Sequence, residues 1–275
     1  MNHSAPVNHR TSAAGEFYDE LPLWSARFGQ LILDQVPLRS GMTILDIGAG
    51  TGWLSLELAQ RCGAETTVIA VDSWEDAMQR LARKVDHLGL RNVRLLVQDA
   101  AAFDLPDASV DLIVSNLGIN NFENREAVLQ ACFRVARPGA ELFVTTNLVG
   151  HMREFYDVYR DVLRELGLAD QVAALESHIH HRATIDSVRS QLESAGFQFV
   201  RAATHSFRER FVDGSALLRH YFIRLGFLPG WKEVVPSPDV ERTFAALERR
   251  LNRVAAEHSE LTLTVPGACI QARRG

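Results

Sequence analysis

Cysteine is scarce in this sequence, and long apolar runs are missing from it. The 275 residues include three cysteines, Cys62, Cys132 and Cys269, whose wide separation fits neither a disulfide framework nor a metal site. We therefore expect three small buried side chains and no bound metal. No apolar run approaches the roughly 20 residues that span a bilayer, and the polar first ten residues lack the apolar core of a signal peptide. These absences predict a soluble, cytoplasmic protein without stable membrane insertion.

An excess of positive charge is also missing. The formal net charge is −5, which argues against nucleic acid or an anionic membrane as a general partner. Hydrophobic residues make up 47% of the chain and charged residues 23%, as in ordinary globular proteins. The length suits one large α/β domain with an appendage. Nucleic acid is therefore not an expected partner, and a homodimer is left open.

The rest of the chain is organised around residues 43–59, TILDIGAGTGWLSLELA. The apolar run at its start predicts a buried parallel strand, and the leucines at its end predict an amphipathic helix. Gly48, Gly50 and Gly52 lie between them, in a turn that lets backbone N–H groups approach a ligand closely. Asp46 ends the strand, at the sheet edge where open α/β folds bind ligands.

Two ligand classes fit such a turn. Dinucleotide enzymes need Gly-x-Gly-x-x-Gly, but Trp53 occupies the position of the third glycine. The carboxylate of Asp46 would repel a pyrophosphate, whereas it suits a ligand with an ammonium group. The stretch resembles the first motif of class I S-adenosylmethionine-dependent methyltransferases, Asp/Glu-x-Gly-x-Gly-x-Gly. A non-catalytic regulator that binds S-adenosylmethionine is the alternative, and a nicotinamide-dependent oxidoreductase of similar fold is a weaker one.

Two more strands ending in an acid follow. Asp72 ends the apolar run VIAVD, 20 residues after Gly52, where an acidic residue should meet ribose hydroxyls. Ser73 and Trp74 come next, and the indole either lies against the adenine or packs at the start of the next helix. The third strand, residues 93–99, ends at Asp99. The resemblance implies that Asp99 takes the adenine amino group and the N–H of Ala100 a ring nitrogen. It assigns the cofactor site to Asp46, Gly48, Gly50, Gly52, Asp72, Ser73, Trp74, Asp99, Ala100, Asn116 and Leu117.

The later motifs continue the same order. Residues 110–116 predict a fourth strand, whose mouth SNLGINNF would place Asn116 and Leu117 beside the transferring methyl group. RPGAELFVTT resembles the turn before the fifth strand of the family. Strands alternating with helices predict a doubly wound, Rossmann-like parallel sheet, with helix 75–88 ended by Gly89. The tail predicts a helix over 183–195 and strands over 197–202 and 261–272, giving seven strands with the last antiparallel. The resemblance is nearest to the ubiquinone- and menaquinone-biosynthesis methyltransferases and related small-molecule enzymes. SNLGINNF lacks the Asn/Asp-Pro-Pro-Tyr signature of enzymes that methylate nucleic-acid bases.

We predict six segments. They are an N-terminal tail and cap helix (1–40), the cofactor-binding core (41–147), a cap insertion (148–182), a core helix and strand (183–204), a helical insertion (205–258) and the final core strand (259–275). Long insertions at the mouth of a scaffold usually carry function. We expect the two insertions and the N-terminal helix to form a cap that closes over the cofactor.

The cap segments are rich in aromatic residues and histidine, which suit the wall of an amphipathic pocket. The candidate substrate-binding residues are Tyr18, Trp24, Asn116, Asn120, His151, Tyr156 and His220. His151 and Tyr156 are also the candidate catalytic residues, because a general base is needed if the nucleophile arrives protonated. His178, His180 and His181 could ligate a metal, but no nearby Cys, Asp or Glu completes a set, so an exposed or capping cluster is favoured. Arg208, Arg210, Arg219 and Arg224 suggest an anionic substrate group, but a plain solvated surface is the default interpretation.

Overall fold

The computed structural model describes residues 22–275, which form two compact units. We call them the sheet unit, with residues 22–147, 183–205 and 267–275, and the helical unit, with residues 148–182 and 206–266. Two strands, β6 and β7, contribute residues to both units. Each unit is described by itself.

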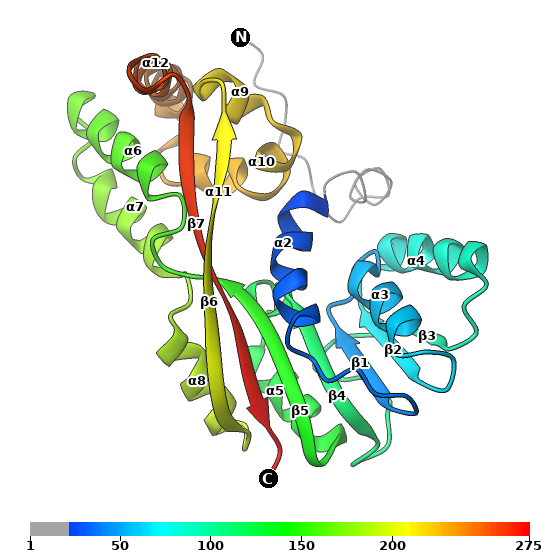
Figure 1. Ribbon diagram of the computed structural model, residues 1–275. Coiled ribbons are helices and arrows are strands. Elements are labelled where there is room, and N and C mark those ends of the chain that lie inside the picture. The colour runs from blue at the N-terminus through cyan, green and yellow to red at the C-terminus, as the bar shows by residue number, and fades with distance from the viewer. Residues whose placement is uncertain (1–21) are drawn as a thin grey trace. The chain divides into compact units, whose positions relative to one another are not determined.

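The sheet has seven strands in the order β3-β2-β1-β4-β5-β7-β6 (Figure 1). The strands are β1 (Thr43–Ile47), β2 (Thr67–Asp72), β3 (Val93–Val97), β4 (Val110–Asn116), β5 (Ala136–Asn147), β6 (Gln198–Phe211) and β7 (Leu261–Arg273). The pairs β1–β2, β1–β4, β2–β3 and β4–β5 are parallel, and β5–β7 is antiparallel. The predicted doubly wound sheet with an antiparallel last strand is thereby confirmed.

Helices flank the strands of the sheet unit. They are α2 (Pro22–Leu33), α3 (Trp53–Arg61), α4 (Glu75–Leu88), the short 3-10 helix η1 (Gly118–Asn120), α5 (Arg125–Val135) and α8 (Ile185–Ser194). The central strands are buried along almost their whole length, as expected for a parallel sheet covered by helices: Ile44, Leu45 and Leu112 are 0% exposed. Because all parallel strands point the same way, Asp46 and Asp72, near the carboxyl ends of β1 and β2, come to one edge.

Helix α2 is packed tightly into the sheet unit. Phe28 and Ile32 are fully buried, and α2 contacts β4 and β5. A Cβ at Gly29 would lie 2.2 Å from the indole of Trp53, so α2 approaches the start of α3 as closely as glycine permits. Gly267 likewise leaves room for the ring of Phe28. The predicted helix in this stretch is therefore an integral part of the sheet unit.

The helical unit contains α6 (Arg153–Glu165), α7 (Gln171–His180), α9 (Gly214–Arg219), α10 (Tyr221–Gly226), α11 (Leu228–Glu233), η2 (Ser237–Asp239) and α12 (Val240–His258). Its core is aromatic. Trp231 is fully buried and stacks on Phe155 with a centroid distance of 3.9 Å. The Trp231 carbonyl accepts the Tyr159 hydroxyl at 2.8 Å, and its indole N–H donates to the Tyr156 hydroxyl at 3.1 Å. These bonds satisfy polar atoms that burial would otherwise penalise.

The predicted sixth strand was too short. We expected strand over residues 197–202, whereas β6 continues to Phe211. Arg210 on this extension forms an ion pair with Glu260, which directly precedes β7. Within residues 22–275, no helix combines the length and the apolar character needed to cross a bilayer.

Candidate active site

The glycine turn between β1 and α3 is built by backbone hydrogen bonds. The N–H groups of Gly48 and Ala49 both reach the Val71 carbonyl of β2, at 2.9 and 3.1 Å. Gly50 has a φ of +55°, a left-handed conformation that side chains disfavour, and a Cβ there would meet no atom within 4 Å. At Gly52, by contrast, a Cβ would lie 2.1 Å from Leu81 of α4. Gly52 is therefore required by packing, whereas Gly50 borders open space.

Asp46 is buried beneath this turn, at 1% exposure. Its carboxylate accepts the Ser55 hydroxyl at 2.6 Å and is also hydrogen-bonded by the Ser55 backbone. Ser55 lies in the first turn of α3, whose N-cap, Gly52, has no side chain to offer. Asp46 thus caps α3 from a neighbouring strand. Burial raises the pKa of Asp46 to about 7. The hydrogen bond from Ser55 lowers this pKa, and the negative charge of Asp72 raises it by a smaller amount than burial does.

Asp72, at the end of β2, is tied to the same turn. One carboxylate oxygen accepts the Gly50 N–H at 2.8 Å, and the other accepts the Trp74 N–H at 2.8 Å. Each oxygen has a second lone pair, so the carboxylate retains accepting capacity toward a ligand. Asp72 therefore connects the glycine turn, the end of β2 and the start of α4.

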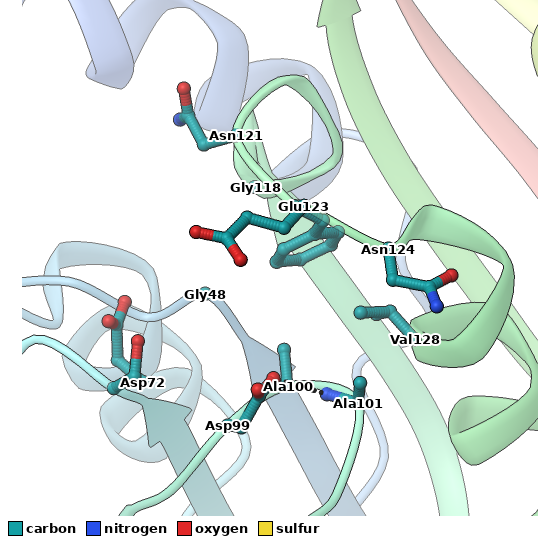
Figure 2. A pocket seen from close by; sticks show the side chains of 12 residues that line it. Gly48, Asp72, Asp99, Ala100, Ala101, Gly118, Asn121, Glu123, Asn124 and Val128 are labelled. Atoms are coloured by element: carbon teal, nitrogen blue, oxygen red, sulfur yellow. Dashed lines mark hydrogen bonds between the residues drawn. The ribbon is translucent and has the colours of Figure 1, made fainter.

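A cavity of about 260 Å³ opens beside these groups (Figure 2). It is lined by Gly48, Asp72, Ser73, Asp99, Ala100, Ala101, Gly118, Asn121, Phe122, Glu123, Asn124 and Val128. Five of these residues belong to the cofactor site predicted from sequence: Gly48, Asp72, Ser73, Asp99 and Ala100. All twelve lie in the sheet unit.

The lining is acidic. Figure 2 shows the carboxylates of Asp72, Asp99 and Glu123 on the walls of this cavity, and no lysine or arginine is among its lining residues. Asp99 is held by the Ala101 N–H, which donates to its Oδ1 at 2.8 Å. Such a cavity suits a ligand with net positive charge, such as a sulfonium with an ammonium group, and disfavours a pyrophosphate. These carboxylates therefore fit S-adenosylmethionine better than a nicotinamide dinucleotide.

Sequence reasoning identified the loop after β4 as part of the site but did not identify the residues of this loop that line the cavity. Gly118 lines this wall, and glycine is required there because a Cβ would lie 2.5 Å from Ser115 Oγ and 3.0 Å from the Ile47 carbonyl. Phe122 lies against Gly48, where a Cβ would come within 3.3 Å of its ring. Asn124 caps α5 by accepting the Ala127 N–H at 3.0 Å. An asparagine before a helix was the available signal, because it fixes where the loop ends.

Asn116 and Asn120 do not line this cavity; both are tied to the end of β5. Asn116 accepts the Thr145 hydroxyl at 2.8 Å and donates to the Ser25 carbonyl of α2 at 2.9 Å. Asn120 accepts from Thr146 at 2.6 Å and donates to Asn147 at 2.8 Å. These bonds hold the loop in place, including Leu117, whose φ is +63°. Their predicted contacts with cofactor and substrate stay predictions.

The other predicted substrate residues are dispersed. Trp24 lies on α2, 5.8 Å from the Phe28 ring, and Tyr18 lies outside the described residues. His151 and Tyr156 are each 2% exposed within the helical unit, and His220 is exposed there between α9 and α10. Burial, with the charges of Arg182 and His181, holds the pKa of His151 well below its usual value. Within residues 22–275, no group of three or more His, Cys, Asp or Glu is placed to hold a metal.

Comparison with known proteins agrees with this geometry. Residues 38–196, more than half of the chain, match the family model described as "Methyltransferase domain". The ubiquinone/menaquinone biosynthesis C-methyltransferase UbiE of Salmonella arizonae is 30% identical over 179 residues, which cover 61% of this chain and 71% of that protein. A SAM dependent methyltransferase from Aquifex aeolicus has a TM-score of 0.54 at 22% identity and covers 70% of this chain and 92% of its own. The structure of phosphoethanolamine N-methyltransferase 2 of Haemonchus contortus, in complex with S-adenosyl-L-methionine, has a TM-score of 0.56 at 14% identity. The match covers 97% of this chain and 58% of that protein.

The family match, together with a fold and an acidic cavity that agree with it, identifies a class I S-adenosylmethionine-dependent methyltransferase. At these identities the two structures show the fold alone, and the family match carries the assignment. The chain belongs to the methyltransferase family that its residues 38–196 match, and it is similar to the ubiquinone-biosynthesis branch. As a member of this family, it uses S-adenosylmethionine as its cofactor.

Proposed function

We propose that this methyltransferase methylates a small, partly apolar molecule by in-line displacement. The observation that carries the proposal is the cavity of the sheet unit. It is lined by five predicted cofactor residues, two of which are the carboxylates Asp72 and Asp99, and by a third carboxylate, Glu123, but by no basic residue. When bound, S-adenosylmethionine supplies a methyl group on a positively charged sulfur. Because that charge disappears on transfer, the chain's contribution is to align the reactants and to exclude water rather than to stabilise new charge on sulfur.

We assign roles by position. Asp72 would accept hydrogen bonds from the ribose hydroxyls. It would use the carboxylate lone pairs that are not engaged by the N–H groups of Gly50 and Trp74. Asp99 would accept the adenine amino group, and the N–H of Ala100 would donate to a ring nitrogen. Both residues line the cavity, next to Ser73.

The glycine turn would receive the methionine end of the cofactor. Gly48 lines the cavity and Gly50 faces open space. Asp46 and Gly52 would act indirectly, because one caps α3 and the other packs on Leu81. Leu117, held by the hydrogen bond from its N–H to Thr145 Oγ1 at 3.0 Å, would border the methyl group with Asn116.

The class of substrate rests on two features. A chain with a formal net charge of −5 is poorly suited to nucleic acid as a general partner, and the loop after β4 lacks the signature of base-methylating enzymes. His151 and Tyr156 are the proposed groups for proton transfer where the nucleophile arrives protonated. The low pKa of His151 leaves its imidazole neutral at physiological pH, the form in which it can accept a proton.

Calorimetric titration tests the cofactor assignment. S-adenosylmethionine should bind, and NADH should not. A screen for methyl release with phenols, quinone precursors, carboxylates and amines then tests the substrate class. Binding of the cofactor without methyl release to any acceptor would favour a non-catalytic regulator, whereas binding of NADH alone would contradict the cofactor site.

A further inference from the structure

The arginines of the helical unit differ in how they are paired. Arg210 pairs with Glu260, Arg219 with Glu248 at 3.1 Å and Arg160 with Glu176 at 2.6 Å. Arg182 is half-buried and has no carboxylate partner within residues 22–275. Its Nε is buried and lacks a hydrogen-bond partner in the same part of the chain. A partly desolvated guanidinium without an anion is costly, so its retention needs an explanation.

An aromatic ring holds Arg182 in place. The guanidinium carbon lies 5.8 Å from the centroid of Phe227, within the range of a cation–π contact. Phe227 in turn stacks with Trp231, at 5.8 Å, and with the imidazole of His151, at 5.4 Å. Because Trp231 is fully buried, this support is rigid. The arginine is therefore positioned by an apolar surface rather than by an opposite charge.

Two histidines complete the surroundings. His178 has a buried Nε2 that lacks a hydrogen-bond partner among the described residues. Burial, with the charges of His181 and Arg182, lowers the pKa of His178 to about 4, and the pKa of His151 is also well below its usual value. Both imidazoles are therefore neutral at pH 7, and each carries one N–H. Neutral donors beside a fixed positive charge attract an anion without adding charge repulsion among themselves.

We infer that Arg182, with His151, His178 and the ring of Phe227, forms a binding site for the anionic group of a small aromatic or otherwise apolar ligand. The planar fork of guanidinium N–H groups matches a carboxylate or a phosphate monoester, and Phe227, which is 8% exposed, is the apolar side chain directly beside it. That this ligand is the methyl acceptor rests on the function proposed above. The substrate class then narrows to apolar molecules with an acidic group.

Calorimetry with three simple probes tests the site: benzoate, phenyl phosphate and the uncharged benzamide. In the full-length protein, both anions should bind at least tenfold more tightly than benzamide. Arg182→Gln should weaken both anions at least tenfold and leave benzamide unchanged. Arg219→Gln is the matched control, because Arg219 belongs to the same unit but already pairs with Glu248; it should change none of the three affinities.

Arg182→Lys is a second variant that keeps the test informative where Arg182→Gln fails to fold. It keeps the charge but loses the fork, so its affinity for benzoate should lie between those of the wild type and Arg182→Gln. Equal affinity for all three probes, absence of binding by all three, or wild-type affinity in a folded Arg182→Gln protein would overturn the site. S-adenosylmethionine is titrated separately into each protein. Anion discrimination without cofactor binding would refute the proposed function alone, and cofactor binding without anion discrimination would refute the anion site alone.

Discussion

The backbone N–H of Gly50 donates to the carboxylate of Asp72 at 2.8 Å, between the ends of two neighbouring parallel strands. The residue that borders open space in the glycine turn is thus fixed by the residue proposed to hold the ribose. The same carboxylate accepts the Trp74 N–H, which begins the next helix. A change at Asp72 is therefore expected to affect both the ligand contact and the shape of the turn.

Asp72→Ala should weaken binding of S-adenosylmethionine by about 1.5–3 kcal/mol, the usual range for hydrogen bonds to a charged group. Asp72→Asn keeps an acceptor for the Gly50 N–H but places an amide group where a second acceptor is needed, so its affinity should be intermediate. Titration calorimetry measures both variants. Asp107→Ala is the control, because that carboxylate is 76% exposed and pairs with Arg134. Wild-type affinity in Asp72→Ala would mean that the cofactor lies elsewhere.

Gly50→Val should abolish cofactor binding while the protein stays folded, because the new side chain would enter the space beside the turn. Its φ of +55° also strains any side chain, by about 1–2 kcal/mol. Gly63→Val is a matched control for that strain: Gly63 has a φ of +80° and open space around its Cβ position, between α3 and β2.

Thermal unfolding should show a similar loss of stability in both glycine variants, and equilibrium dialysis should show loss of binding in Gly50→Val alone. Retained binding in a folded Gly50→Val protein would refute a ligand at this turn. Loss of binding in both variants would instead assign the effect to backbone strain.

The fold could be predicted because its signals are local. The apolar run that ends at Asn116 and the helix that ends before Gly89 have the bounds expected from sequence. Gly89 adopts the left-handed C-cap conformation, with a φ of 63°, which is the reason that glycine marks the end of a helix. The extension of β6 was missed since its pairing partner lies far along the chain, where Glu260 meets Arg210.

The candidate site was predictable only in part, for a related reason. A strand-ending acid identifies an edge of the sheet, but the sequence does not say what the carboxylate faces. Asp72 lines the cavity, whereas Asp46 turns beneath the loop to cap α3. Gly118 lines the cavity next to Ser115, and Phe122 lines it next to Gly48. These neighbours come together only after the strands have assembled, so the sequence does not reveal them.

Asp46 should make stability depend on pH. Its pKa is raised from 3.8 to about 7 in the folded protein, so the folded state binds a proton that the unfolded state has already released between these values. The contribution of Asp46 to the free energy of unfolding is fully present below about pH 4 and is lost as the pH rises toward 7. The loss is on the order of a few kcal/mol, since each pKa unit corresponds to about 1.4 kcal/mol.

Asp46→Asn removes this titration, so the melting temperature of the wild type relative to the variant should fall by several degrees between pH 5 and pH 8. Ser55→Ala removes a hydrogen bond that lowers the pKa, so its decline should continue to higher pH. Parallel pH profiles for the wild type and Asp46→Asn would show that Asp46 is ionised throughout this range.

The tie between α2 and the end of β4 should control the opening of α2. Asn116 donates to the Ser25 carbonyl at 2.9 Å while it accepts from Thr145, so it anchors this helix beside the loop that forms the cavity wall. Asn116→Ala should therefore speed hydrogen exchange of backbone amides in residues 22–33, by about fivefold or more for a lost hydrogen bond of about 1 kcal/mol. If α2 acts as a lid, S-adenosylmethionine should slow exchange there in the wild type. Helix α8, in the same unit, is the internal control and should be unchanged. Protection by the cofactor restricted to residues 41–120 would show that α2 is not coupled to cofactor binding, while the contacts proposed for Asp72 and Asp99 would stand.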